Sequence, residues 1–261
     1  MKKIPAGIYQ FDIHMGAVDQ NVKTALDGIS RLSDQGAGLL VLPEMWSSGF
    51  DYPRLSAHAA ETPKILDTLA KTASEKSLLI AGSLPEAEGD HIYNTLYVID
   101  NNGKIAGSYR KAHLFSLIGE DRHLCAGDRP VICETDAGRL GLMICYDLRF
   151  PEFCRSLALQ GAEIVIVCAQ WPSPRIDHWD VLLRARAIEN QLFMIGANRS
   201  GADGELLFSG HSQIVSPTGK VLAMTTAPDT TLTTTIDAAE IEQFRNQFNC
   251  LEQRVPSAYD L

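Results

Sequence analysis

The segment LGLMICYDLRFPE, residues 140–152, combines an apolar run, a cysteine, a short turn and a proline that can start a helix. The run over 140–144 predicts a buried strand, and Pro151 suits the first turn of a helix predicted for 151–160. A strand that leads through a turn into a helix lifts the intervening side chain above the sheet. This layout indicates an α/β fold with Cys145 at a strand end, where such folds carry reactive groups.

The rest of the chain alternates between short apolar runs and amphipathic stretches in the same way. Apolar residues at spacings of three and four predict helices, and short apolar runs beside turn residues predict strands. Helices are expected at 19–35, 62–76, 151–160, 178–191 and 238–247. Strands are expected at 4–13, 37–42, 78–84, 91–100, 104–109, 140–144, 163–169, 192–197, 212–216, 220–224 and 231–236.

Two predicted hairpin turns resemble each other, VIDNNGK at 98–104 and IVSPTGK at 214–220. Hairpins share turn chemistry in any case, but the similarity suggests two related halves packed as layered α/β units. No linker or low-complexity segment separates the halves, so we expect one domain over 1–261.

Composition argues against several classes of protein. The chain has 261 residues, of which 45% are hydrophobic and 21% charged, as in globular rather than disordered proteins. Its 23 basic and 32 acidic residues give a net charge of −9, which argues against nucleic-acid or membrane partners. Six dispersed cysteines form no C-x-x-C motif, and the sequence shows no signal peptide or membrane-spanning run. We therefore expect a protein of the reducing cytoplasm.

Three predicted strand ends carry side chains that could act together. Glu44 follows the strand at 37–42 and a proline, which holds its carboxyl group near the low-dielectric core. Such a carboxyl group tends to a raised pKa and could serve as a general base. Lys111 follows the strand at 104–109, and its charge beside Cys145 would favour the reactive thiolate.

Each of these residues also has an ordinary structural interpretation, since loop acids, edge lysines and buried thiols are common. Together they fit a single mechanism. Glu44 would take the proton of Cys145, whose sulfur would attack an amide carbon. Lys111 and the backbone N–H of Tyr146 would stabilise the tetrahedral oxyanion. Ammonia would leave, and Glu44 would then activate water to hydrolyse the thioester.

Three segments resemble the carbon-nitrogen hydrolase family, or nitrilase superfamily: LPEMW at 42–46, YRKAHLF at 109–115 and CYDLRFPE at 145–152. Their order is that of the family's Glu–Lys–Cys triad, and the resemblance covers nearly the whole chain. It implies a four-layer α-β-β-α sandwich and a homodimer or larger homo-oligomer built through helices. Family members often carry a second glutamate that positions the lysine and the substrate. Glu120 best matches that position, with Asp121 as the alternative.

Within the family, the segments AQWPSPR at 169–175, HW at 178–179 and ARAIENQ at 185–191 are most similar to the omega-amidase branch. This resemblance implies hydrolysis of the terminal amide of 2-oxoglutaramate or 2-oxosuccinamate to the dicarboxylate and ammonia. The same triad would also serve an N-carbamoyl amine or acid, a nitrile or a deaminated peptide amide. A protein that kept the fold and binds amides without turnover is a further hypothesis.

The remaining candidates concern the substrate pocket. Arg149, next to the Cys145 turn, could bind the far acid of the substrate, or could pair with Asp147 or Glu152 and brace the turn. Aromatic residues near the motifs could form the pocket walls, although aromatics are often simply core. These are Trp46, Phe115, Tyr146 and Trp171. No H-E-x-x-H motif, P-loop or His/Cys/carboxylate cluster suggests a metal or cofactor.

Overall fold

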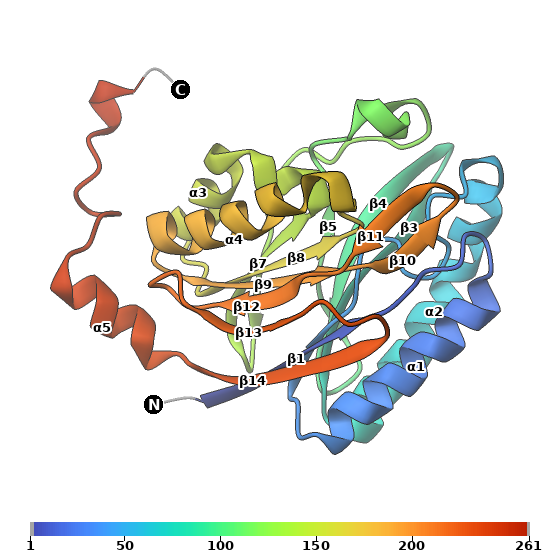
Figure 1. The fold of residues 1–261 in the computed structure, drawn as a ribbon, viewed down its shortest axis with the longest axis horizontal. Helices are drawn as coiled ribbons and strands as arrows, with labels where there is room; N and C mark the ends of the chain where they lie inside the picture. The colour runs from blue at the N-terminus through green and yellow to red at the C-terminus, as the bar shows by residue number, and fades with distance from the viewer. Residues whose placement is uncertain (1–2, 260–261) are drawn as a thin grey trace.

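The computed structural model describes residues 3–259, which form two six-stranded sheets stacked between pairs of helices (Figure 1). The first sheet has the strand order β14-β1-β2-β3-β4-β5. Its strands are β1 (Lys3–Gln10), β2 (Leu39–Val41), β3 (Leu79–Glu88), β4 (His91–Ile99), β5 (Ile105–Arg110) and β14 (Thr230–Asp237). The second sheet has the order β13-β12-β9-β8-β7-β6. Its strands are β6 (Ile132–Thr135), β7 (Gly138–Ile144), β8 (Ile164–Ala169), β9 (Phe193–Asn198), β12 (Ser212–Val215) and β13 (Val221–Thr225).

The helices cover the outer faces of the two sheets (Figure 1). Helices α1 (Val18–Asp34) and α2 (Leu55–Lys76) pack on the first sheet, and α3 (Pro151–Leu159) and α4 (Ile176–Asn190) on the second. Helix α5 (Ala239–Gln247) follows β14 towards the C-terminal end. Strands β10 (Ser200–Asp203) and β11 (Leu206–Ser209) form a separate hairpin. Over residues 3–259, no helix has both the length and the apolar character needed to cross a membrane.

Strand β8 shows how the layers are held together. Its side chains point alternately to the two faces of the sheet, as the period of two in a strand requires. Ile166 points into the core between the sheets, whereas Val167 points into the core under α3 and α4. A third core joins the first sheet to α1 and α2. Three cores between four layers confirm the predicted α-β-β-α sandwich and explain why the run over 164–169 is apolar throughout.

The two large sheets share one plan. In each, three parallel strands have one antiparallel strand on one side and an antiparallel hairpin on the other. The hairpins β4–β5 and β12–β13 contain the two similar turns, and in both the pairing shifts register close to the turn. The structure therefore agrees with the two related halves that those turns suggest.

Two predictions from the sequence are wrong in detail. Helix α2 begins at Leu55 and not at Thr62, because the chain before Pro63 still packs inward through Leu55 and Ala59. A proline is commoner in the first turn of a helix than inside it, so the sequence pattern predicts a helix that begins close to Pro63. The prediction also omits β6 and the β10–β11 hairpin, because these short strands are only partly buried and lack clear alternation.

Candidate active site

Three strand ends meet where the two sheets face each other. Glu44 follows shortly after β2, Lys111 directly after β5, and Cys145 directly after β7. The first two residues come from one sheet and the third from the other. The stacking of the sheets brings them together, and all three line a single pocket.

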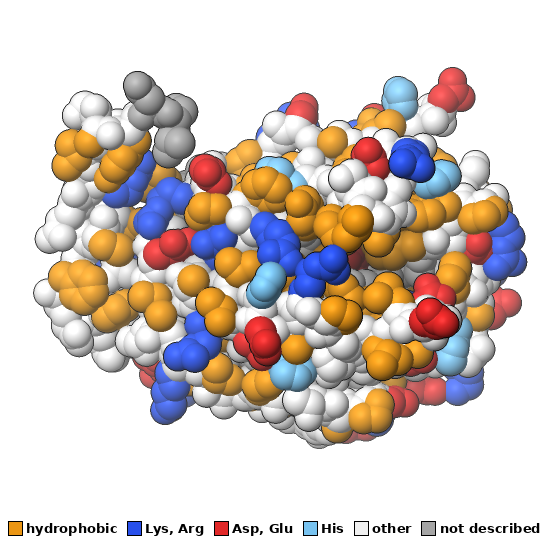
Figure 2. All heavy atoms as spheres, turned by 45° about the horizontal axis from the view of Figure 1, so that its top comes forward, with side chains coloured by type: hydrophobic (Ala, Val, Ile, Leu, Met, Phe, Trp, Pro, Cys, Tyr) orange, Lys and Arg blue, Asp and Glu red, His pale blue; other side chains and the backbone are white. Residues whose placement is uncertain are grey.

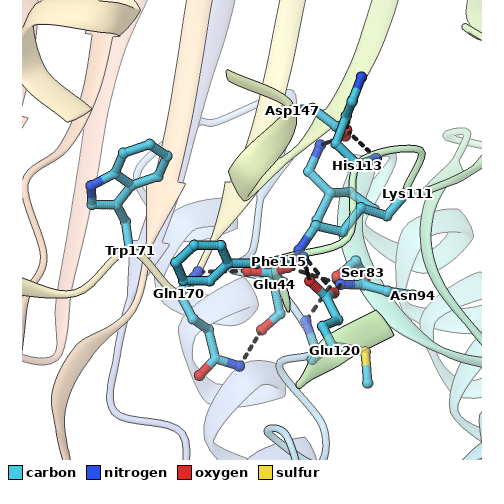
Figure 3. Close-up of polar contacts among 12 residues, drawn as sticks. Glu44, Ser83, Asn94, Lys111, His113, Phe115, Glu120, Asp147, Gln170 and Trp171 are labelled. Carbon is cyan, nitrogen blue, oxygen red and sulfur yellow. Dashed lines mark hydrogen bonds and ion pairs between the residues drawn. The ribbon is translucent and has the colours of Figure 1, made fainter. Parts of the chain in front are cut away.

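Lys111 lies between two buried carboxylate groups (Figure 3). Its Nζ lies 2.8 Å from Oε1 of Glu44, and 2.8 and 2.7 Å from the two carboxylate oxygens of Glu120. All three side chains are at most 1% exposed. Asn94 on β4 donates from Nδ2 to Oε1 of Glu44 at 2.8 Å. A buried ammonium needs such partners, so these contacts fix its position. Of the two acidic residues considered for the second acidic position, Glu120 contacts Lys111, whereas Asp121 is exposed.

Cys145 lies at a tight turn where β7 leads into the 3-10 helix Cys145–Arg149. Its φ is +45°, in a region that residues other than glycine seldom adopt. The buried side chain of Asp147 holds the turn by accepting a hydrogen bond from the backbone N–H of Ile144 at 2.8 Å. Such strain persists only where the surrounding structure fixes it, which is typical of functional sites.

The same carboxylate of Asp147 also ties the turn to the segment that carries Lys111 (Figure 3). It accepts hydrogen bonds from the hydroxyl of Tyr109 at 2.8 Å and from the backbone N–H of His113 at 3.0 Å. The His113 ring lies 2.7 Å away through Nδ1. One buried acid therefore connects the first sheet to the second at the pocket.

Asp147→Asn is expected to lower the free energy of unfolding by about 3 kcal/mol, because hydrogen bonds to a buried charge are lost and the new amide NH₂ faces other donors. Chemical denaturation monitored by circular dichroism measures the change. Glu134→Gln is a matched control, because its 3.0 Å pair with Arg139 is exposed and should contribute less than about 1 kcal/mol. Equal, small changes in both variants would contradict the bracing role of Asp147.

Burial and neighbouring charges set the protonation of the three groups. Burial raises the pKa of Glu44, although the charge of Lys111 opposes the shift. Burial alone would lower the pKa of Lys111, but the carboxylates of Glu44 and Glu120 outweigh it and raise that pKa well above its ordinary value. Burial, and next the charge of Glu44, raise the pKa of the Cys145 thiol. The resting site therefore holds an ammonium ion and a protonated thiol beside a carboxylate of raised basicity.

Glu44 is also held from the second sheet, by Gln170 directly after β8 (Figure 3). The backbone N–H of Gln170 donates to Oε2 of Glu44 at 2.9 Å, and its Nε2 donates to the backbone carbonyl of Glu44 at 2.9 Å. Arg199 in turn donates to Oε1 of Gln170 at 2.9 Å and to Asp12 at 3.0 Å. Both carboxylate oxygens of Glu44 are thus engaged, and the network fixes their orientation.

The pocket beside these groups has a volume of about 200 Å³ and mostly apolar walls, which include Phe115, Tyr146 and Trp171. Figure 2 shows a hollow edged by hydrophobic side chains, with basic side chains gathered along one side. Besides Lys111, two lining residues are basic: Arg149, 4.6 Å from the ring of Trp171, and Arg175, 5.9 Å from the ring of Phe115. Among the described residues, no group of three or more His, Cys, Asp or Glu side chains is arranged to hold a metal ion.

Arg149 does not brace the turn that carries Cys145. Within residues 3–259 it forms no ion pair with Asp147 or Glu152, and its Nη1 instead lies 3.3 Å from Nδ1 of His178. Asp147, rather than Arg149, holds the turn. Arg149 instead lines the pocket, where its charge is available to a ligand.

The prediction that Trp46 lines the pocket is wrong. Trp46 is fully buried in the core between the first sheet and helices α1 and α2. Met45 has a φ of +45°, and this turn sends the side chains of Glu44 and Trp46 in different directions. The indole lies against Gly82 of β3, where a Cβ atom would come within 2.8 Å of Nε1.

No site role is predicted from the sequence for Asn94, Gln170 or Arg199, although all three support Glu44 directly or through a neighbour. Each is a polar side chain in or beside an apolar strand. Buried polar groups require partners, and this rule could have marked them as members of a network. It could not have identified Glu44 as the group they hold.

Comparisons with known proteins agree on one family. The profile of the family described as carbon-nitrogen hydrolase matches residues 6–246. The chain is 42% identical to a 2-oxoglutaramate amidase of Bacillus subtilis over 216 residues, 82% of this chain and 83% of that protein. A carbon-nitrogen hydrolase structure from Helicobacter pylori is 25% identical, with a TM-score of 0.93 over 99% of this chain and 97% of that one. The structure of an amidase variant from Nesterenkonia sp. AN1 is 26% identical, with a TM-score of 0.88 over 98% of this chain and 95% of that one. In that variant, the acetamide moiety of fluoroacetamide is added covalently at the active-site cysteine.

Proposed function

Because the chain belongs to the carbon-nitrogen hydrolase family, we propose that it hydrolyses the terminal amide of a small 2-oxo dicarboxylate monoamide to the dicarboxylate and ammonia. The candidate substrates are 2-oxoglutaramate, for which the Bacillus subtilis relative is named, and 2-oxosuccinamate. The observation that carries the proposal is the placement of Glu44, Lys111 and Cys145 in one pocket that also has basic lining residues. Water is the only co-reactant.

In the first half-reaction, Glu44 takes the proton of Cys145 while the sulfur attacks the amide carbon. The carbonyl electron pair moves onto oxygen, near the charge of Lys111 and the N–H of Tyr146. That N–H lies in the first turn of a helix, where backbone donors lack helical partners. When the carbon–nitrogen bond breaks, Glu44 gives its proton to nitrogen, and ammonia leaves a thioester on Cys145.

In the second half-reaction, Glu44 takes a proton from water, and the water oxygen attacks the thioester carbon. The carbon–sulfur bond breaks, and sulfur recovers its proton from Glu44. Amide and water have then become acid and ammonia. Lys111 stays protonated throughout, because the adjacent carboxylates raise its pKa, and Glu120 positions it through two short contacts.

An ammonia assay over a panel of amides, with parallel detection of carbon dioxide, tests this function. The 2-oxo dicarboxylate monoamides should release ammonia without carbon dioxide. Release of both products, confined to N-carbamoyl amines or acids, would assign the carbamoyl reaction instead. Stoichiometric binding of amides without ammonia release would show a binding protein on this fold.

Arg149→Met is expected to raise KM for 2-oxoglutaramate by about tenfold to a hundredfold, because one charge-assisted hydrogen bond to the far carboxylate is lost. Methionine keeps apolar bulk beside Trp171, and KM for a neutral amide such as propionamide should change little. The matched control is Arg129→Met, because Arg129 is highly exposed and lies outside this pocket. Initial-rate kinetics of the unaltered protein and both variants are measured with both substrates, and an unchanged KM for 2-oxoglutaramate in Arg149→Met would place the far acid elsewhere.

We also propose that the chain forms one catalytic domain and assembles in the cytoplasm as a homodimer or larger homo-oligomer through its helices. The pairing of β14 with β1 supports a single domain, because it joins distant parts of the chain in one sheet. On α4, Val181 and Ile188 are 65% and 45% exposed, which offers apolar surface to a second copy. All six cysteines are free, which suits a reducing compartment. Sedimentation velocity would measure the size of the assembly.

A further inference from the structure

We propose that the hydroxyl of Tyr52 donates a hydrogen bond to the 2-oxo oxygen of the substrate and so selects 2-oxo amides over amides that lack this oxygen. The inference rests on the function proposed above. Tyr52 begins the 3-10 helix Tyr52–Arg54, between β2 and α2, and lines the same pocket as Glu44 and Cys145. No role for Tyr52 is predicted from the sequence.

The hydroxyl of Tyr52 is buried and has no hydrogen-bond partner within residues 3–259. Natural proteins satisfy most buried polar groups, since leaving one without a partner destabilises the fold. An exception therefore calls for a functional explanation or for a group that binds at that point. Because Tyr52 lines the reaction pocket, a bound substrate is the group that can supply the missing partner.

The ring of Tyr52 is already fixed in place. It stacks on the ring of His123, with centroids 4.3 Å apart and planes at 13°, and its centroid lies 5.9 Å from that of Phe50. The preceding residue, Asp51, is anchored by Arg54 at 2.7 Å. A hydroxyl held before the ligand arrives gives up little entropy when it forms a hydrogen bond.

The surroundings make this hydroxyl a donor without an acceptor. Burial, followed by the charges of Glu120 and Glu44, raises the pKa of Tyr52, which keeps the hydroxyl protonated. Both oxygens of each carboxylate already accept other hydrogen bonds, several of them from Lys111. The proton of Tyr52 is therefore left for an oxygen that enters the pocket.

The substrate offers three groups that accept hydrogen bonds. Its amide oxygen becomes the oxyanion beside Lys111 and the N–H of Tyr146, and its far carboxylate suits the guanidinium of Arg149. The 2-oxo oxygen is the acceptor that remains, and an uncharged hydroxyl suits an uncharged carbonyl. A site built to hydrogen-bond one substrate group discriminates against the analogue without it, because its own polar group is then left unpaired.

The test compares two substrates that differ only in the 2-oxo group, 2-oxoglutaramate and glutaramate. Tyr52→Phe should lower kcat/KM for 2-oxoglutaramate about tenfold, the effect of one neutral hydrogen bond, and change that for glutaramate less than about twofold. Tyr93→Phe is the matched control, because its ring lies over Arg110, outside this pocket. Both substrates should react with this control as with the unaltered protein.

The melting temperature supplies an independent measurement. Since the Tyr52 hydroxyl makes no hydrogen bond with any of residues 3–259, Tyr52→Phe should melt at the same temperature or higher. Equal loss of kcat/KM on both substrates, or a clearly lower melting temperature, would indicate a structural role and overturn the inference. The inference and the proposed function fail in different ways. If the unaltered protein releases no ammonia from either substrate, both the inference and the proposed function are overturned. If it turns over both substrates and Tyr52→Phe loses the same share of kcat/KM on each, only the role of Tyr52 is overturned.

A binding experiment provides a second arm that does not depend on turnover. In Cys145→Ala, 2-oxoglutarate should bind about tenfold more tightly than glutarate by calorimetry, and Tyr52→Phe in the same background should remove this preference. Equal affinities in the Cys145→Ala background would overturn the inference.

Discussion

Cys145→Ala is expected to reduce ammonia release from 2-oxoglutaramate by a factor on the order of 10⁴ to 10⁶, the range seen when an enzyme loses its covalent nucleophile. Without the sulfur no thioester can form, and Glu44 and Lys111 can only hold the substrate. Alanine meets the same backbone constraint at φ +45° as cysteine, so the variant should stay folded. A coupled ammonia assay and a thermal unfolding scan measure the two properties.

Cys125→Ala is the matched control for this variant. Cys125 is another free cysteine, outside the pocket and 3.4 Å from Nδ1 of His91. Its loss should leave the rate unchanged. Acid quenching of the unaltered protein during turnover should give an acyl mass adduct on the peptide that carries Cys145, and none in Cys145→Ala. Full activity in Cys145→Ala would disprove the thioester mechanism.

Much of the fold could be predicted from sequence because its layers impose clear patterns. Strand β8 is buried on both faces, so the run over 164–169 is wholly apolar, and the two hairpin turns occupy equivalent places in the two sheets. The prediction is wrong where tertiary contacts outweigh local preference. Helix α2 continues through Pro63 because residues on both sides pack inward, and no local pattern shows this.

The candidate site could be predicted only in part, for a related reason. The strand-end positions of Glu44, Lys111 and Cys145 can be read from local sequence, whereas the order of the strands and the stacking of the sheets bring them together. Trp46 shows the limit of prediction from local sequence. The backbone at Met45 has a positive φ, and the ring of Trp46 lies in the core between the first sheet and helices α1 and α2. The partners of Glu44 lie far away in sequence, and their contacts exist only in the folded chain.

Glu44→Gln should lower kcat by about 10² to 10⁴, the usual contribution of a general base. Glutamine has the size of glutamate but cannot accept the proton of the thiol or of water. Lys111 keeps its two contacts with Glu120, so the buried ammonium retains a compensating charge and the variant should fold. Single-turnover kinetics with 2-oxoglutaramate should show slower formation and slower hydrolysis of the thioester.

The pH dependence separates a base from a residue that only shapes the pocket. A base works when deprotonated, so kcat/KM should fall as the pH drops through the pKa of Glu44. Burial raises that pKa, which places the acid limb of the profile at higher pH than an ordinary glutamate would give. The residual activity of Glu44→Gln should lack this limb, whereas Glu88→Gln, which changes an exposed partner of Arg110, should retain it. If Glu44 only shaped the pocket, Glu44→Gln would lower the rate equally at every pH and leave the acid limb in place. That profile would contradict its assignment as the base.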